Sequence, residues 1–385
     1  MASDLTYALI TPYSLLKSRT GGVIARLLSL CNLDLVAARM YAPSDAFAEE
    51  YARSCQQEGS PPEIRPVVAE YVRSMFPRNN RFGISNRIMV LLFEGRNAVR
   101  RLHEVVGPIS RDVSGNTVRG TYGDFVTSQS GEVTFFEPAV LAPATEAEAR
   151  IQLGLLAKYA RPDGGILTNV LTFPKGTEVE TVLVIIKPDN FVKRSSLPGN
   201  IIDVLSRTGL YIVAAKVFHM TVAQAEQFYR PVREMFVQRL APQLEAELRR
   251  VLEAHFGFAF PDSAVRSMVH ASREANAEHE FRKIVNYMAG DTGGASAGDF
   301  KGKCFAMLYQ GVDAIQKIRA RLGATNPRNA DAGTVRSIYG QDLMKNGAHA
   351  SDSPENAERE RRIIGLWEES GACDVESIVN THQVP

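Results

Sequence analysis

The fold is decided by an apolar stretch that occurs twice, as residues 184–188 (VIIKP) and residues 7–12 (YALITP). Both copies are rich in aliphatic side chains and end at a proline, which is typical of a short β-strand that stops at a turn. Further blocks repeat in the same order, pairing residues 21–28 with 199–205, 35–39 with 212–216, 89–95 with 305–311, and 117–119 with 334–336. The chain is therefore interpreted as a tandem repeat.

The spacing of the repeat also locates an insertion. Thr11 and Lys187 are 176 residues apart and Tyr51 and Tyr229 are 178 apart, whereas the later pair Arg119 and Arg336 is 217 apart. About 40 additional residues therefore enter the second copy after Tyr229. We expect them near 231–275, where residues 238–256 have the apolar spacing of a helix.

Each copy alternates short Val- and Ile-rich strands with helical patterns. This order predicts an α+β fold made of two tandem ferredoxin-like (βαββαβ) domains, each an antiparallel sheet with helices packed on it. We expect a first domain at 1–157, a linker rich in Pro and Gly at 158–180, a second domain at 181–372 that includes the insertion, and a peripheral tail at 373–385.

Composition limits the possible functions. The 385 residues carry 44 Lys and Arg against 43 Asp and Glu, so the formal net charge is +1 and favours no general attraction to nucleic acid. No apolar run approaches the roughly 20 residues of a membrane span, and the N-terminus lacks the pattern of a secretion signal. The four cysteines form no CxxC pair, and the histidines lack metal-binding spacing. We therefore expect a cytoplasmic protein without a protein-ligated metal or a membrane partner.

The second copy contains a set of polar residues whose chemistry fits a phosphorylated ligand. Cationic side chains and a hydroxyl can hold a polyphosphate, and an imidazole is a competent nucleophile toward a phosphoryl group. Singly, each has an ordinary alternative, such as a solvated lysine at a strand end or a structural histidine. The candidates are Lys187, Arg319, Thr325, Arg336, Asn346 and His349.

Four motifs in this copy are similar to those of a known family. They are residues 186–189 (IKPD), 323–327 (GATNP), 333–336 (GTVR) and 346–353 (NGAHASDS). Through these motifs the second copy resembles the nucleoside diphosphate kinase family, and the resemblance covers nearly all of 181–367. The resemblance implies ping-pong transfer of the terminal phosphate of ATP to a nucleoside diphosphate, through a phosphorylated histidine. It also implies Mg²⁺ bound through the nucleotide phosphates, and a homo-oligomer.

The resemblance implies a role for each matched residue. His349 would be the phosphorylated residue, and Ser351 and Glu360 would orient it, with Glu358 as a second candidate for the glutamate. The expected phosphate contacts are Lys187, Arg319, Thr325 and Arg336. Lys187 and Asn346 would also lie near the ribose, and Tyr229 would lie beside Lys187. Phe281 would stack on the base, with Leu343 on its other side.

Departures from the family pattern leave a second hypothesis open. Ala350 replaces the glycine usual after the histidine, Ser337 follows Arg336, and the insertion lies between Tyr229 and Phe281. The alternative is therefore a catalytically weak or inactive nucleotide-binding or scaffold protein of the same fold. A nucleic-acid-binding module is disfavoured because basic and aromatic residues do not alternate.

The first copy lacks the catalytic pattern. Thr11 stands in place of the lysine, His103 in place of Arg319, and Ala139 near the histidine position, whereas Arg119 is retained. We therefore expect the first domain to be a degenerate, non-catalytic member of the same family.

Overall fold

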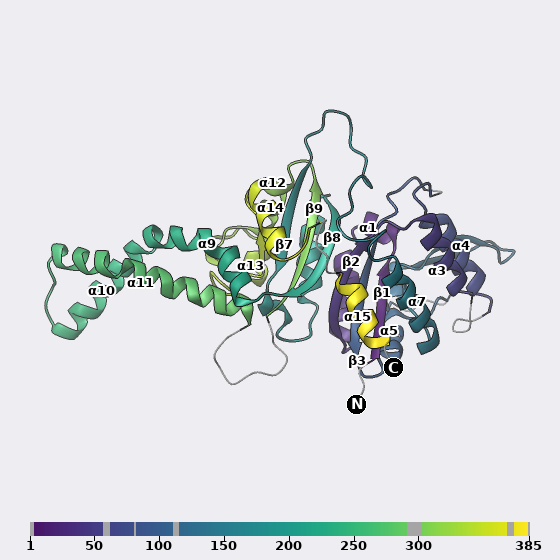
Figure 1. Cartoon of the computed structure of the whole chain (residues 1–385), viewed down its shortest axis with the longest axis horizontal. Coiled ribbons are helices and arrows are strands. Elements are labelled where there is room, and N and C mark those ends of the chain that lie inside the picture. Colours follow the sequence, from purple (N-terminus) through teal and green to yellow (C-terminus); the bar gives the residue numbers. More distant parts are fainter. Residues whose placement is uncertain are drawn as a thin grey trace. The chain divides into compact units, whose positions relative to one another are not determined.

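The computed structural model describes residues 4–56, 62–80, 82–110, 115–290, 302–367 and 373–383. It contains two compact units. One comprises Met1–Phe218 and Cys304–Pro385, and the other comprises His219–Lys303. Figure 1 shows the helices and strands of the chain.

The first domain belongs to the larger unit. Its strands are β1 (Asp4–Ile10), β2 (Asp34–Tyr41), β3 (Ile88–Gly95), β4 (Asp124–Thr127), β5 (Val133–Glu137) and β6 (Val140–Leu141). Its helices are α1 (Pro12–Leu16), α2 (Thr20–Leu30), α3 (Asp45–Ser54), α4 (Arg65–Met75), α5 (Ala98–Val106), α6 (Val118–Tyr122) and α7 (Glu146–Lys158).

The second domain follows the same plan. Its strands are β7 (Glu180–Ile186), β8 (Tyr211–His219), β9 (Lys303–Gly311) and β10 (Ala348–Ala350). Its helices are η1 (Pro188–Phe191), α8 (Leu197–Ser206), α12 (Ala314–Leu322), η2 (Pro327–Asn329), α13 (Val335–Tyr339) and α14 (Pro354–Ile363), and α15 (Asp374–Gln383) follows them.

The two four-stranded sheets have equivalent strand orders, β2-β3-β1-β6 and β8-β9-β7-β10. The central strands β1 and β7 pair antiparallel with β3 and β9, and on their other edges with β6 and β10. Equivalent residues also begin equivalent helices, since Thr117 and Thr334 cap α6 and α13, and Thr145 and Ser353 cap α7 and α14. This architecture confirms the predicted α+β fold with tandem domains.

The two domains contact each other through helices α2 and α8. Helix α2 packs against α8, and matching glycines lie at the crossing. A Cβ added to Gly21 would lie 2.4 Å from the backbone nitrogen of Asp203, and one added to Gly199 would lie 2.2 Å from that of Ala25. Glycine is therefore required at both positions for the helices to approach so closely.

The linker runs along the outer strands of both sheets. The Gly165 amide donates to the Met40 carbonyl of β2 at 3.0 Å, and the Leu167 amide donates to the Val213 carbonyl of β8 at 2.9 Å. The linker is thus attached to each domain through backbone hydrogen bonds.

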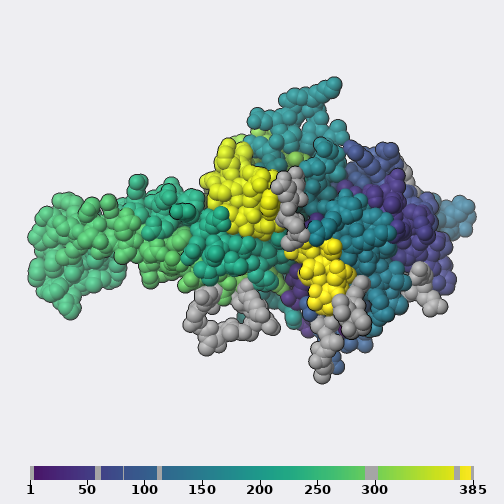
Figure 2. Space-filling view, viewed as in Figure 1, coloured from purple at the N-terminus to yellow at the C-terminus, as the bar shows by residue number. Residues whose placement is uncertain are grey.

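The C-terminal segment differs from its prediction as a peripheral tail. Cys373, Val375 and Val379 are buried in the hydrophobic core of the first domain. Helix α15 packs against α7 and the β1–β2 region, and Figure 2 shows it in yellow against the teal surface of the first domain. The apolar positions at 375 and 379 share one helical face, so their burial explains why the prediction of a peripheral tail is wrong.

The smaller unit contains three helices, α9 (Val222–Arg239), α10 (Ala241–Phe256) and α11 (Asp262–Ala289). Helix α11 packs along α9 and along α10 (Figure 1). The single helix predicted over 238–256 is instead divided at Leu240, and Pro242 lies in the first turn of α10, where proline is well tolerated. In the part of the chain that the structure describes, no helix combines the length and apolar character of a membrane span.

Candidate active site

Lys187 lies directly after β7 and is 8% exposed. Its Nζ donates to the Asn346 Oδ1 at 2.8 Å and to the Met344 carbonyl at 3.0 Å. Burial, and secondarily the nearby Arg336 charge, lower the pKa of Lys187 from its ordinary 10.5 to about 8. The ammonium group is therefore held in position by two neutral acceptors.

Asn346 connects three segments around this lysine. Besides accepting from Lys187, its amide donates to the carbonyls of Thr325 and Leu343, both at 3.0 Å. It is 1% exposed. The side chain thus positions the lysine and the adjacent loops, and its contact with the ribose stays a prediction from the family resemblance. Thr325 and Leu343 themselves have exposed side chains.

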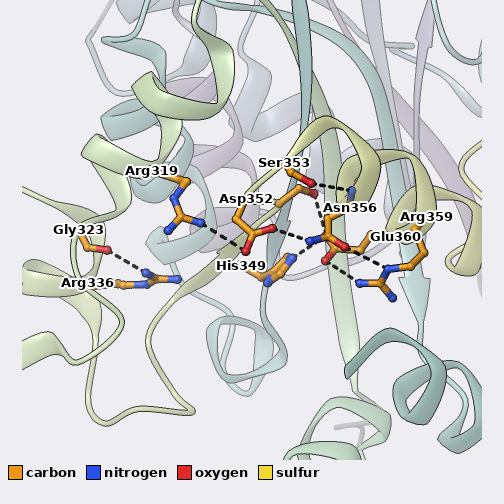
Figure 3. A network of polar contacts seen from close by, with 10 residues as sticks. Arg319, Gly323, Arg336, His349, Asp352, Ser353, Asn356, Arg359 and Glu360 are labelled. Carbon is orange, nitrogen blue, oxygen red and sulfur yellow. Dashed lines mark hydrogen bonds and ion pairs between the residues drawn. The ribbon is translucent and has the colours of Figure 1, made fainter. Parts of the chain in front are cut away.

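His349 lies on β10, opposite Ile185 of β7. Its Nε2 is 2.8 Å from a carboxylate oxygen of Glu360 on α14, and the Ser351 hydroxyl donates to the same oxygen at 2.7 Å. Ser351 and Glu360 are both buried. Figure 3 shows His349 and Glu360 facing each other from strand and helix. The predicted orienting residues therefore contact each other, and Glu360 contacts the histidine.

Sequence reasoning missed one member of this group, Arg359. Its guanidinium donates to the second Glu360 oxygen at 3.3 Å (Figure 3). One feature of the sequence could have indicated this contact, because an arginine directly precedes the candidate glutamate. The other candidate, Glu358, instead pairs with Arg361 and Arg362.

Two arginines approach the histidine strand from other elements. Arg336 on α13 donates to the Gly323 carbonyl at 2.8 Å and to the Ala348 carbonyl at 3.2 Å, next to His349. Arg319 in the last turn of α12 lies 3.9 Å from the Asp352 carboxylate, and both side chains are more than half exposed. Figure 3 shows both arginines on one side of His349. The site thus combines an oriented imidazole with cationic side chains.

Tyr229 and Phe281 lie in the smaller unit, on α9 and α11. Tyr229 packs against its neighbour Phe228, with ring centroids 4.9 Å apart. Their predicted contacts with Lys187 and with a base stay predictions from the family resemblance.

The strand register of the first domain shows which residue occupies the histidine position there. Leu9 pairs with Leu141 and Ile10 with Val140, whereas the equivalent residues Ile185 and Ile186 pair with His349 and Ala348. The histidine position is therefore occupied by Leu141, and the expectation that Ala139 stands there is wrong.

Ala139 instead matches Gly347. Their φ angles are +60° and +84°, and their carbonyls accept from the amides of Thr11 and Lys187, respectively. Leu141 is 3% exposed in an apolar core. A leucine has no nucleophilic atom, so the first domain carries no counterpart of His349.

In the first domain, side chains that hydrogen-bond to one another fill the rest of the region that corresponds to the site. The Tyr7 hydroxyl contacts the Tyr51 hydroxyl and the Gln152 amide oxygen, both at 2.5 Å. The Arg119 guanidinium donates to the Val140 and Gly107 carbonyls, the same pattern as Arg336. Arg119 therefore supports the backbone of the first domain.

No group of three or more His, Cys, Asp or Glu side chains able to hold a metal occurs among the described residues.

Comparison with known proteins agrees with this arrangement. The family model described as "Nucleoside diphosphate kinase" matches residues 180–245 and 274–367. It leaves 246–273 unmatched, within the predicted insertion. A nucleoside diphosphate kinase of Azorhizobium caulinodans is 31% identical over 179 residues, which are 46% of this chain and 88% of that protein. One of Persephonella marina is 29% identical over 47% of this chain and 90% of its own length.

Among solved structures, an NDP kinase from Pyrobaculum aerophilum aligns with 50% of this chain and 99% of its own, at 27% identity and a TM-score of 0.36.

Proposed function

The chain belongs to the nucleoside diphosphate kinase family, and from this premise we propose that its second domain transfers the terminal phosphate of ATP to nucleoside diphosphates. The observation that carries the proposal is the His349–Glu360–Ser351 group, placed beside the cationic side chains of Arg319 and Arg336. An imidazole held in this way is suited to accept a phosphoryl group.

Glu360 would set the tautomer of the histidine. A carboxylate bonded to Nε2 favours the proton on that nitrogen and leaves the lone pair on Nδ1. Nδ1 would attack the terminal phosphorus of ATP, the new N–P bond would form, and the bond from phosphorus to the bridging oxygen would break to release ADP. The carboxylate would also stabilise the positive charge that develops on the ring.

The cationic side chains would bind and align the phosphates. Lys187, Arg319 and Arg336 would offset the charge of the transferring group and hold it in line with Nδ1. Mg²⁺ bound to the nucleotide phosphates would supply further charge neutralisation. A nucleoside diphosphate would then take the phosphoryl group from His349 by the reverse sequence of bond changes.

The scaffold alternative depends on the substitutions near the histidine. Ala350 is the last residue of β10 and pairs with Val184, and its φ angle is not positive. A Cβ is tolerated in such an extended backbone. Ala350 is therefore compatible with the proposed enzyme. A homo-oligomer and a cytoplasmic location stay predictions from the resemblance and the composition.

Initial-rate kinetics test the proposal. With ATP varied at several fixed concentrations of a nucleoside diphosphate other than ADP, ping-pong transfer gives parallel double-reciprocal lines. Binding of both nucleotides without turnover would support the scaffold alternative instead.

Glu360→Gln is expected to lower kcat/KM by about 10- to 1,000-fold, because the neutral amide cannot stabilise positive charge on the ring, and each tenfold is ~1.4 kcal/mol. Steady-state assays of the variant measure this loss. Glu358→Gln is the matched control on the same helix, since its carboxylate pairs with Arg361 and Arg362. Equal activities of the two variants would remove Glu360 from the mechanism.

The rate should also decrease at alkaline pH. The pKa of Lys187 is lowered to about 8, so this side chain is charged below that pH and loses its proton as the pH rises through it. We expect kcat/KM, which reports the free enzyme, to fall above pH about 8, and Lys187→Arg to shift this decrease to higher pH. An unchanged pH profile in the arginine variant would assign the decrease to another group.

The lowered pKa of Lys187 also makes the stability of the folded protein depend on pH. Because the folded-state pKa lies below the ordinary 10.5, the buried charge destabilises the folded protein below pH about 8. That penalty disappears as the pH rises toward 10.5, so the contribution of Lys187 to stability becomes more favourable over this interval.

A further inference from the structure

A cavity of about 330 Å³ lies where the two domains, the linker and the C-terminal segment meet. Its walls come from the outer strands β2 and β8, from linker residues 161–166, and from the chain on either side of the α14–α15 connection. It contains none of the residues assigned above to phosphoryl transfer. Its volume falls in the range of small-molecule sites and exceeds the space of a single water about tenfold.

Two cationic side chains reach the cavity from equivalent positions of the repeat. Arg39 lies on β2 and Lys216 on β8, 177 residues apart. The Arg39 Nε donates to the Ala160 carbonyl at 2.7 Å, and the Lys216 Nζ donates to the Gly365 carbonyl at 3.0 Å. Among the described residues, the bond to the Ala160 carbonyl is the one hydrogen bond that Arg39 makes. A guanidinium has five N–H donors, so most of its capacity is available to a ligand.

Cationic side chains outnumber carboxylates among the described residues that line the cavity. Arg161 is a third cation of the wall, and it pairs with Glu376 at 2.5 Å. Asp374 is the one carboxylate among the described wall residues, and it lies 3.6 Å from the Lys216 Nζ. Because the chain as a whole carries a net charge of only +1, this excess is local. An anion in the cavity would gain from it.

Glycines keep the space beside both cations open. Gly165 and Gly365 have φ angles of +121° and +67°, and a Cβ at either would lie 3.2 Å from the Arg39 Nη2 or the Lys216 Nζ, respectively. A side chain at these positions would strain the backbone and crowd the two charged groups. The backbone therefore leaves both cations accessible from within the cavity.

We propose that this cavity binds a phosphate group, with Arg39 and Lys216 as its ligand-binding residues. A guanidinium fork suits two oxygens of a phosphate, and an ammonium adds a point charge from the opposite strand. The volume leaves room for an organic group esterified to the phosphate. Such a ligand would contact both domains and the segment after α14 at the same time, so its binding stabilises their association.

Trp367, the one tryptophan of the chain, lines the cavity and provides a local probe. The experiment titrates the intact protein with ribose 5-phosphate and with inorganic phosphate at constant ionic strength, while following tryptophan fluorescence. Ribose serves as the uncharged control. We expect a saturable change with a phosphate compound and none with ribose. Tighter binding of ribose 5-phosphate identifies an ester as the ligand class, whereas equal affinities identify the free ion.

Variants assign the signal to the cavity. Arg39→Gln and Lys216→Gln keep a donor for the backbone carbonyl but lose the charge, and each is expected to weaken binding at least tenfold. Arg321→Gln, on the exposed side of α12, and Arg319→Ala, near His349, are expected to retain the signal. The absence of a saturable change in the unmodified protein would overturn the proposal. So would equal affinities of the unmodified protein and folded Arg39→Gln, with folding checked by thermal melting.

Discussion

His349→Ala is expected to abolish both phosphorylation of the protein and transfer to nucleoside diphosphates. The side chain supplies the only proposed nucleophile, and the bond of its Nε2 to Glu360 sets the reactive tautomer. Loss of a covalent nucleophile typically reduces turnover by several orders of magnitude, far more than loss of one hydrogen bond. The measurement is a single-turnover assay with labelled ATP, followed by steady-state rates.

His103→Ala is the matched control in the first domain. His103 occupies the position of Arg319, and burial with the nearby Arg119 charge lowers its pKa. Its replacement is expected to leave turnover unchanged. Retained transfer in His349→Ala would contradict the proposed nucleophile.

Arg319→Ala is expected to reduce kcat/KM by at least 100-fold, equivalent to about 2.7 kcal/mol of lost transition-state stabilisation. Its ion pair with Asp352, at 3.9 Å, is exposed, so loss of this pair should change the free energy of unfolding by less than ~1 kcal/mol. Arg319 is therefore a better test of the phosphate contacts than Arg336. Removing Arg336 also removes two hydrogen bonds to backbone carbonyls and is expected to destabilise the domain.

Arg321→Ala, two residues along the same helix, is the matched control. Arg321 has an exposed side chain and lies outside the motif, so we expect less than a twofold change. Both variants should keep their melting temperatures. Equal, small effects at 319 and 321 would favour the scaffold alternative.

The sequence was sufficient to predict the repeat, the sheet architecture and the partners of His349. Repeated blocks in one order require two similar sheets, and the spacing from His349 to Glu360 fits a short strand followed by the first turns of a helix. It did not predict the packing of α15, because two buried valines on a ten-residue helix do not reveal which surface covers them.

The misplaced alignment in the first domain also has a physical cause. Strand β6 has only two residues, and Ala139 adopts a positive φ where its counterpart is Gly347. An alanine in a conformation that favours glycine conceals the correspondence, and only the strand register shows that Leu141 occupies the histidine position. The sequence also did not predict that the Asn346 amide makes three hydrogen bonds within the protein.

The central claim is that one domain transfers phosphate through one histidine. Its most direct test is to incubate the full chain with ATP labelled on the terminal phosphate and Mg²⁺, and to count the acid-labile, base-stable phosphate bound to the protein. We predict a value approaching one per chain, and none in His349→Ala. A value near two would show that the first domain is catalytic, and a value near zero in the unmodified protein would contradict the account.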